Sequence, residues 1–191
     1  MGLRNLRRRL HQERLSAIKR FEKQKRANLL AAPGVHEFVV VLDGLKPGFN
    51  IGKIFRSADA LGAFEVHVIG TSFFDPAPAK GSFKYVPARF HSDFSSCYTE
   101  LTRRDYCLYT LEPAAGEELP RIHLPRRSAF IFGNEEFGFS FCKKEFRKIK
   151  ALRIPQFGKV ESLNVSIAAS IVMYEYIRQH GSGVNTPSNS E

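Results

Sequence analysis

The fold class of this 191-residue chain is decided by one stretch, Ile154-Pro155-Gln156-Phe157-Gly158-Lys159-Val160-Glu161-Ser162-Leu163-Asn164-Val165-Ser166. A strand expected over residues 150–154 ends at Pro155, because proline has no backbone N–H to continue a sheet. A glycine loop follows, and a final helix is expected to begin near Ser162. The free N–H groups of a helix N-terminus attract anions, so polar Ser162 and Asn164 are candidate site residues. On pattern alone, a plain N-cap at Ser162 and an exposed Asn164 remain an alternative.

Upstream of this stretch, short β-rich runs alternate with helical patterns. Strands are expected over residues 37–42, 65–69, 106–111, 128–132 and 150–154. Helices are expected over residues 50–61, 92–103, 139–148 and 162–180. This alternation predicts an α/β fold with a mostly parallel sheet and helices on both faces. Residues 71–91, which contain three prolines, are expected to be irregular.

A second candidate segment opens the first of the helices expected after a strand. Asn50 can cap this helix, and Gly62 can end it in a left-handed turn. Arg56 interrupts a row of apolar residues, Ile51, Ile54, Phe55, Ala58 and Leu61. An arginine near a buried face usually has an anionic partner. A surface arginine whose stem covers apolar neighbours is the more ordinary explanation, and the pattern alone favours it.

The third candidate segment is Gly133-Asn134-Glu135-Glu136-Phe137-Gly138, directly after an apolar strand. Two glycines around a tight loop allow a ligand to approach the backbone closely. Ligands of open α/β sheets bind at the carboxyl ends of the strands, which is where this loop is expected. By itself the segment is equally compatible with an ordinary strand-to-helix turn.

Together, the three segments resemble the motifs of the SpoU (TrmH) family of the SPOUT superfamily. The first motif is matched by Asn50, Gly52, Arg56 and Gly62. The second is matched by Gly133, Glu135 and Gly138. The third is matched by Ile154, Pro155, Gly158, Ser162, Leu163, Asn164, Val165 and Ser166. The resemblance spans roughly residues 36–178. Gln156 is a small departure, since methionine is common there.

The resemblance implies a C-terminal deep trefoil knot, one of the rare exceptions to unknotted chain connectivity. It also implies a homodimer whose active sites are built from both subunits. The implied cofactor is S-adenosylmethionine, held mainly by loop backbone, and no metal is expected. The cofactor-binding residues that the resemblance implies are Phe132, Gly133, Glu135, Gly138, Ile154, Val160, Ser162 and Leu163.

The implied reaction moves a methyl group from S-adenosylmethionine to a ribose 2′-hydroxyl of tRNA or rRNA. The implied catalytic residue Arg56 would lie next to that hydroxyl, with Asn50 orienting it. Glu135 would brace the cofactor's edge, and Ser162 and Asn164 would hold the RNA phosphate and the catalytic geometry. A guanidinium effectively never loses its proton. We therefore expect Arg56 to lower the hydroxyl's pKa and fix its direction, while the proton leaves to phosphate or water.

Three other functions remain as alternatives. The first is a knotted RNA-binding protein without activity, which the intact set of motif residues disfavours. The second is a SPOUT enzyme that methylates an RNA base, and the Arg56 motif with Ser162-Leu163-Asn164 favours ribose instead. The third is a non-enzymatic dimeric scaffold, which would leave the glycine-rich loops unexplained.

The net charge of +10 is concentrated at the N-terminus, where residues 1–30 hold ten basic and two acidic side chains. Leucines at helical spacing predict a basic amphipathic helix to about Leu30, with residues 1–34 forming an arm and linker. Residues 35–180 would form the methyltransferase domain and residues 181–191 a disordered tail. A basic arm suits a polyanion. The expected RNA-binding residues are Arg7, Arg8, Arg9, Arg14, Lys19, Arg20 and Arg56. A presequence, a calmodulin-type target helix and a solvated face remain alternatives for the arm.

Composition excludes several other classes of protein. No apolar run approaches the ~18 residues of a membrane span, and no short apolar run follows a charged start. Three cysteines without C-x-x-C spacing argue against a disulfide framework or a zinc site, and the six histidines show no ligand spacing. These features lead us to expect a cytoplasmic protein with reduced thiols.

Overall fold

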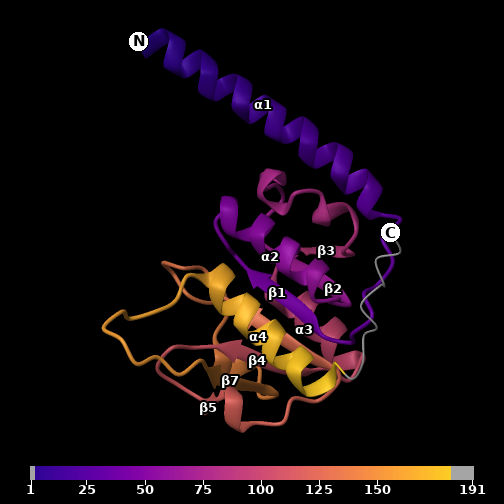
Figure 1. Cartoon of the computed structure of the whole chain (residues 1–191), viewed down its shortest axis with the longest axis vertical. Helices are drawn as coiled ribbons and strands as arrows, with labels where there is room; N and C mark the ends of the chain where they lie inside the picture. The colour runs from indigo at the N-terminus through magenta and orange to yellow at the C-terminus, as the bar shows by residue number, and fades with distance from the viewer. Residues whose placement is uncertain (1–2, 182–191) are drawn as a thin grey trace, which may run out of the picture.

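The structure is a computed structural model that describes residues 3–181 (Figure 1). Its centre is a seven-stranded sheet with the strand order β3-β2-β1-β6-β4-β7-β5, in which neighbouring strands are parallel. The strands are β1 (Val39–Asp43), β2 (Glu65–Ile69), β3 (Ala88–His91), β4 (Cys107–Leu111), β5 (Glu117–Glu118), β6 (Ser128–Phe132) and β7 (Ile149–Arg153). The parallel α/β fold predicted from the sequence is therefore confirmed.

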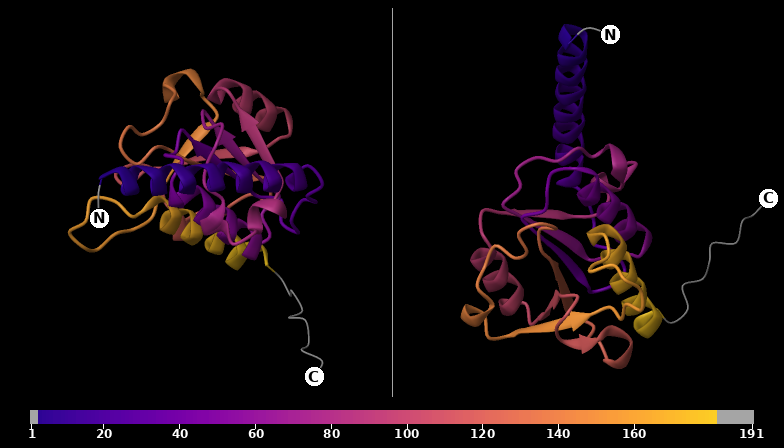
Figure 2. Two further views of the ribbon diagram at one scale, coloured as in Figure 1. Left: turned by 90° about the horizontal axis from the view of Figure 1, so that it is seen from above. Right: turned by 90° about the vertical axis from the view of Figure 1, so that its left-hand side faces the viewer.

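Helices cover both faces of the sheet. The α-helices are α1 (Leu3–Asn28), α2 (Phe49–Ala60), α3 (Phe94–Arg103) and α4 (Val165–His180). Four single-turn 3₁₀ helices are also present: η1 (Ala77–Ala79), η2 (Ser82–Lys84), η3 (Leu119–Arg121) and η4 (Lys143–Glu145). In Figure 2, the view from above shows α4 and α3 on opposite sides of the sheet. Among residues 3–181, no helix is long and apolar enough to cross a membrane.

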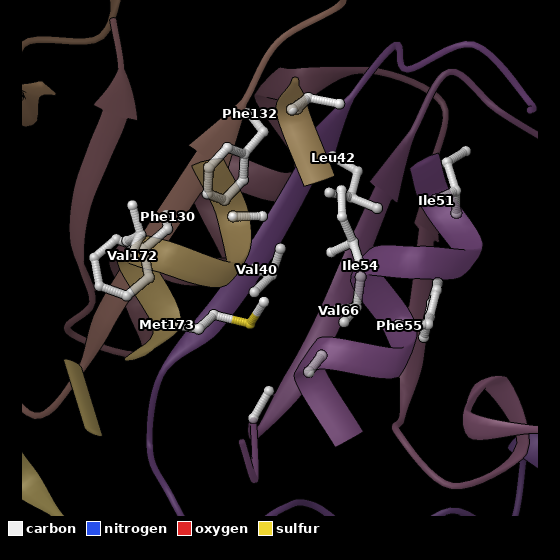
Figure 3. Packing of buried hydrophobic residues seen from close by; sticks show 14 of the residues in the cluster. Val40, Leu42, Ile51, Ile54, Phe55, Val66, Phe130, Phe132, Val172 and Met173 are labelled. Atoms are coloured by element: carbon white, nitrogen blue, oxygen red, sulfur yellow. The ribbon is translucent and has the colours of Figure 1, made fainter. Parts of the chain in front are cut away.

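The alternation of side chains along β1 separates two hydrophobic clusters. Val40 and Leu42 point toward α2 and α4, whereas Val39 and Val41 point toward α3. Figure 3 shows the first cluster, in which α2 and α4 pack on β1 and β6 through Ile51, Ile54, Phe55, Phe130, Phe132, Val172 and Met173. Each such side chain contributes roughly 1.5–3 kcal/mol when fully buried. This packing fixes the two helices whose N-terminal ends reach the candidate site.

Helix α1 belongs to the domain over its carboxyl-terminal half and projects from it over the other half (Figures 1 and 2). Phe21 is 1% exposed and packs in the core against Phe74 and Phe83. The Asn28 amide donates to the carbonyl oxygens of Phe83 and Val86 at 2.5 and 2.7 Å. The core packing of α1 thus begins near Ala17, within the expected arm of residues 1–34.

Three segments differ from the sequence prediction. Strand β3 forms in the proline-containing region that is expected to be irregular, and the short β5 is not expected at all. The helix expected over residues 139–148 is absent, and only η4 forms there. Phe139 and Phe141 pack on the α3 side of the sheet, where Phe141 stacks on Phe94 at 3.6 Å between ring centroids. An extended chain places the alternating side chains of Phe139 and Phe141 on the same side, whereas a helix would turn them apart. The expected disordered tail lies, beyond Gly181, outside the described residues.

Candidate active site

A cavity of about 260 Å³ lies at the carboxyl ends of β4, β6 and β7. Leu111, Phe132 and Ile154 come from the ends of these three strands, and Val165 comes from the first turn of α4. This volume is slightly below the ~300–1,000 Å³ typical of ligand pockets. Because the strands are parallel, their carboxyl ends meet at one edge, where ligands of open α/β sheets bind.

The loop after β6 forms one wall of this cavity. Asn134 and Gly138 exchange backbone hydrogen bonds of 2.7 and 2.9 Å, which closes the loop into a tight turn. Gly138 has φ +74°, and a Cβ on Gly133 would lie 2.8 Å from the backbone of Gly138. Both positions therefore require glycine. In the structure, the close backbone approach at these two glycines is that of the loop to itself.

Two side chains that sequence analysis does not single out fix this loop to β1. Asn134 donates to the carbonyl oxygen of Gly44 at 2.7 Å. Asp43, at the end of β1, accepts from the backbone N–H and the hydroxyl of Ser140 at 2.7 and 2.6 Å. Burial raises the pKa of the Asp43 carboxyl, and the two hydrogen bonds from Ser140 oppose that rise. The position of Asp43 at a strand's end is the only sequence signal for this role.

A chain of amides and one carboxylate joins the three sequence motifs. The Asn50 amide donates to Glu135 Oε1 at 2.6 Å, and the Asn164 amide donates to Asn50 Oδ1 at 3.3 Å. Asn164 also caps α4, since its Oδ1 accepts from the backbone N–H of Ser166 at 3.0 Å. Asn164 rather than Ser162 is therefore the cap. Asn50 is not the cap of α2, because Gly48 precedes the helix and the Asn50 side chain bonds to Glu135 instead.

Two expected catalytic residues, Arg56 and Ser162, are not part of this hydrogen-bond chain, and of these only Ser162 lines the cavity. Arg56 is the more distant case. It lies on the exposed face of α2, opposite the buried side chains of Ile54, Phe55 and Ala58. Among the described residues, no hydrogen bond or ion pair to its guanidinium is found. In this structure, Arg56 has the surface position that the sequence pattern alone favours.

Seven of the eight expected cofactor-binding residues line the cavity, namely Phe132, Gly133, Glu135, Gly138, Ile154, Ser162 and Leu163. Val160 is the exception, being 65% exposed and outside the lining. The lining also includes residues that sequence analysis does not predict, which are Leu111, Glu112, Pro113, Asn134, Phe139, Gln156, Val165 and Ala168. Leu111 at the end of β4, with Glu112 and Pro113 after it, could not be found by motif, because only strand pairing brings them to this edge.

The cavity fits a cofactor that has a flat apolar part and several polar groups. Leu111, Phe139 and Leu163 supply apolar wall, while Glu135 supplies a carboxylate. The Oε1 atom of Gln156 is buried and has no hydrogen-bond partner among the described residues. A buried acceptor without a partner is costly, so this atom suits a donor on a bound molecule. S-adenosylmethionine has the matching chemistry: an aromatic base, neutral donors and a charged amino-acid end.

A second polar cluster lies between β2, β3 and α3 and shares no residue with the cavity lining. His67 Nδ1 lies 2.9 Å from His91 Nε2 and 3.3 Å from Cys97 Sγ, although the sequence shows no ligand spacing among these residues. The edges of a tetrahedral zinc site would be ~3.4 Å between nitrogens and ~3.6 Å between nitrogen and sulfur. The observed distances are shorter and match hydrogen bonds. His67 Nε2 also bonds to buried Glu65 at 3.0 Å, so the cluster joins its three elements as a hydrogen-bond network.

The expected RNA-binding side chains of the arm lie exposed along α1, namely Arg7, Arg8, Arg9, Arg14, Lys19 and Arg20. Two of them already have carboxylate partners: Arg9 contacts Glu13 at 2.9 Å and Arg20 contacts Asp75 at 3.3 Å. Exposed ion pairs contribute only ~0–1 kcal/mol, so both arginines can exchange these partners for phosphate.

The fold and the cavity together define an α/β protein that binds its ligand in loops at the carboxyl ends of parallel strands. Residues 37–174 match the model of the SpoU rRNA Methylase family, and the chain belongs to that family. It is 30% identical to the 23S rRNA (guanosine-2′-O-)-methyltransferase RlmB of Xylella fastidiosa, over 87% of this chain and 68% of the relative. It is also 30% identical to the tRNA (guanosine(18)-2′-O)-methyltransferase of Thermus thermophilus, over 75% of each chain.

A solved structure shows the same fold with a cofactor. The SpoU methyltransferase AviRb from Streptomyces viridochromogenes, in complex with AdoMet, aligns with a TM-score of 0.70 and 28% identity, over 81% of this chain and 62% of that chain. The chain thus spans about two thirds of the length of such relatives. Family membership confirms the resemblance read from the three motifs. The two curated relatives are named as RNA 2′-O-methyltransferases, and the AviRb structure holds AdoMet.

Proposed function

We propose that this chain transfers a methyl group from S-adenosylmethionine to a ribose 2′-hydroxyl of tRNA or rRNA. The observation that carries this proposal is the Asn164–Asn50–Glu135 hydrogen-bond chain beside the cavity. It joins one residue from each motif, and these motifs lie on three different elements. The relatives are named for 2′-O-methylation of guanosine in 23S rRNA and in tRNA, and we propose one of these two RNA classes as the substrate.

The bound cofactor supplies a methyl group already activated by the positive charge of its sulfonium. The protein's task is therefore alignment and control of a proton on a weakly acidic hydroxyl. We assign Glu135 and Asn50 to hold the cavity wall in place, and Ser162 with the N-terminal end of α4 to hold the RNA phosphate. Arg56 directs the 2′-hydroxyl and lowers its pKa by its permanent charge.

This role for Arg56 requires a second subunit, and we propose a homodimer. Helix α4 leaves Ile167, Ile171 and Tyr174 exposed in one row, with exposed fractions of 53%, 38% and 64%. Their spacing of four and three residues makes one helix face. Ser57, next to Arg56, forms a hydrogen bond with Ser170 of α4 at 2.8 Å, so the turn of α2 that carries Arg56 packs against the helix that carries this apolar row. A second subunit packed against this row would lie close to Arg56, which supports an active site shared between subunits.

Two further parts of the proposal concern the chain's path and its RNA contacts. We propose that the segments after β6 and β7 close a deep trefoil knot around the cavity, which their convergence on one site supports. We also propose that the basic side chains of α1 contact RNA phosphates in the cytoplasm, without reading sequence. No metal takes part in the proposed mechanism.

The test is methyl transfer from labelled S-adenosylmethionine to tRNA and to rRNA fragments, with the modified ribose mapped after digestion. Arg56→Ala should lose more than 90% of turnover, a cost above ~1.4 kcal/mol in the transition state, while S-adenosylhomocysteine affinity stays unchanged. Arg56→Lys should fail as well, because a point charge does not replace the guanidinium fork. Lys53→Ala, on the same exposed face of α2, is the matched control. Methylation found on a base, or full turnover without Arg56, would contradict the proposal.

A further inference from the structure

Gln156 is the first residue after Pro155 in the loop that follows β7, and its side chain is part of the cavity lining. The Oε1 atom of this side chain is buried and has no hydrogen-bond partner among the described residues. An unsatisfied buried acceptor costs roughly 1–3 kcal/mol. An unsatisfied atom of this kind needs an explanation in a folded protein, and in a cavity lining a bound ligand can supply the missing donor.

The kind of donor that Gln156 suits follows from its charge and its surroundings. A side-chain amide is neutral, and a neutral acceptor cannot offset the cost of burying an ammonium group away from water. The nearby lining includes apolar Ile154, Leu111 and Leu163, which suits a flat aromatic ring better than an ionic group. The charged amino-acid end of the cofactor has a better partner in the carboxylate of Glu135.

We propose that the Gln156 side-chain carbonyl accepts a hydrogen bond from the exocyclic amino group of the cofactor's adenine. This inference rests on the proposed use of S-adenosylmethionine and adds a side-chain determinant for the adenine to the backbone contacts that the family resemblance implies. Gln156 thereby makes the cavity selective for an adenine over a hypoxanthine base. Hypoxanthine carries a carbonyl oxygen at this position and would place two acceptors face to face.

Binding to the full chain tests this. It is measured by calorimetry with S-adenosylhomocysteine and with S-inosylhomocysteine, in which a carbonyl oxygen replaces the amino group and N1 carries a hydrogen. The wild-type protein should bind the adenine compound at least tenfold more tightly. Gln156→Met should weaken S-adenosylhomocysteine binding by about tenfold, ~1.4 kcal/mol, and leave S-inosylhomocysteine binding unchanged or slightly stronger. Methionine has similar length and is common at this position in the family, so the fold should hold. Gln156→Leu gives a second variant, and the melting temperature checks both.

Gln24→Met is the matched control, because Gln24 Oε1 is also buried without a partner among the described residues but lies in α1, away from the cavity. It should leave both affinities unchanged. Equal binding of S-adenosylhomocysteine by the wild type and Gln156→Met would overturn the inference. So would an equal weakening for both compounds, since Gln156 would then not accept a hydrogen bond from the amino group. Failure of the wild type to bind S-adenosylhomocysteine would instead count against the proposed function itself.

Discussion

Asn164 has two separable functions, since its Oδ1 caps α4 and its amide nitrogen donates to Asn50. Serine can replace the capping oxygen but is too short to reach Asn50 and has no amide. Asn164→Ser should therefore keep the melting temperature and lose methyl transfer. Asn164→Ala should lose both, at a stability cost of ~1 kcal/mol. Thermal unfolding together with turnover on the same two variants checks this. A serine variant with full activity would remove the Asn164–Asn50 hydrogen bond from the mechanism.

The sequence predicts the site residues that lie in recognisable motifs, but not those that act through tertiary contacts. Asn50, Glu135 and Asn164 are predicted because each lies in a recognisable segment, and the structure joins them. Asp43 is missed because a single aspartate after a strand carries no pattern of its own. Its importance comes from Ser140, which lies 97 residues later in the chain.

Among the elements, α1 shows most clearly how local pattern and tertiary packing diverge. The spacing of its leucines predicts a helix, which is present, and its charge predicts a free arm, which holds only for the N-terminal half. Phe21 lies among four phenylalanine rings that come from later in the chain, Phe73, Phe74, Phe83 and Phe90. No local signal distinguishes this buried phenylalanine from the exposed Leu10 on the same helix.

Two truncations should separate the roles of the two halves of α1. Removing residues 1–16 should leave the melting temperature nearly unchanged, whereas removing residues 1–30 should destabilise the fold. The reason is that loss of Phe21 alone should cost ~3–5 kcal/mol. The shorter deletion should weaken RNA binding most at low salt. It should also reduce the slope of log affinity against log salt by ~0.9 for each phosphate that the protein no longer neutralises, if the duplex DNA value applies.

The control for this truncation keeps the helix and changes one property at a time. Replacing Arg7, Arg8, Arg9 and Arg14 by glutamine should reproduce the reduced salt slope. Replacing Leu6 and Leu10 by glutamine should not. If only the leucine variant weakened RNA binding or dimer formation, α1 would act through apolar packing and not through its charge.

The remaining elements are predicted correctly where hydrophobic periodicity is strong and missed where packing overrides it. The five expected strands and the helices α2, α3 and α4 are present with small shifts at their ends. Strand β3 is missed because Pro87 and the short polar run after it give no strand pattern in the sequence. The strand forms because it pairs with β2. Residues 139–148 are expected to form a helix, but their aromatic side chains pack in the cluster around Phe94 instead.

For the whole molecule, the proposed dimer makes a prediction about Ile171, which lies in the exposed row of α4. Ile171→Glu places one carboxylate from each subunit in a symmetric interface, where an unpaired buried charge costs several kcal/mol. The dissociation constant of the dimer should rise by roughly 100-fold or more in sedimentation experiments. Methyl transfer should fall with it, while S-adenosylhomocysteine binding should remain.

Ile18→Glu is the matched control, because Ile18 and Ile171 are 37% and 38% exposed. The Ile18 variant should remain dimeric and active. A wild-type protein that sediments as a monomer at micromolar concentration, yet methylates RNA, would show that Arg56 serves its own subunit's cavity.

The anchoring of α1 has a consequence for how the target nucleotide is chosen. A flexible tail with the same charges would only raise the local concentration of RNA around the protein. Phe21 and Asn28 instead fix the direction of the helix, so residues 3–16 extend as a rigid rod of ~20 Å. On the proposed function, an RNA backbone held along this rod presents a ribose to the cavity at a set distance from the held phosphates. The length and direction of the helix would then set the distance between the held phosphates and the cavity. The methylated nucleotide would be selected by its distance along the RNA from the part that α1 holds.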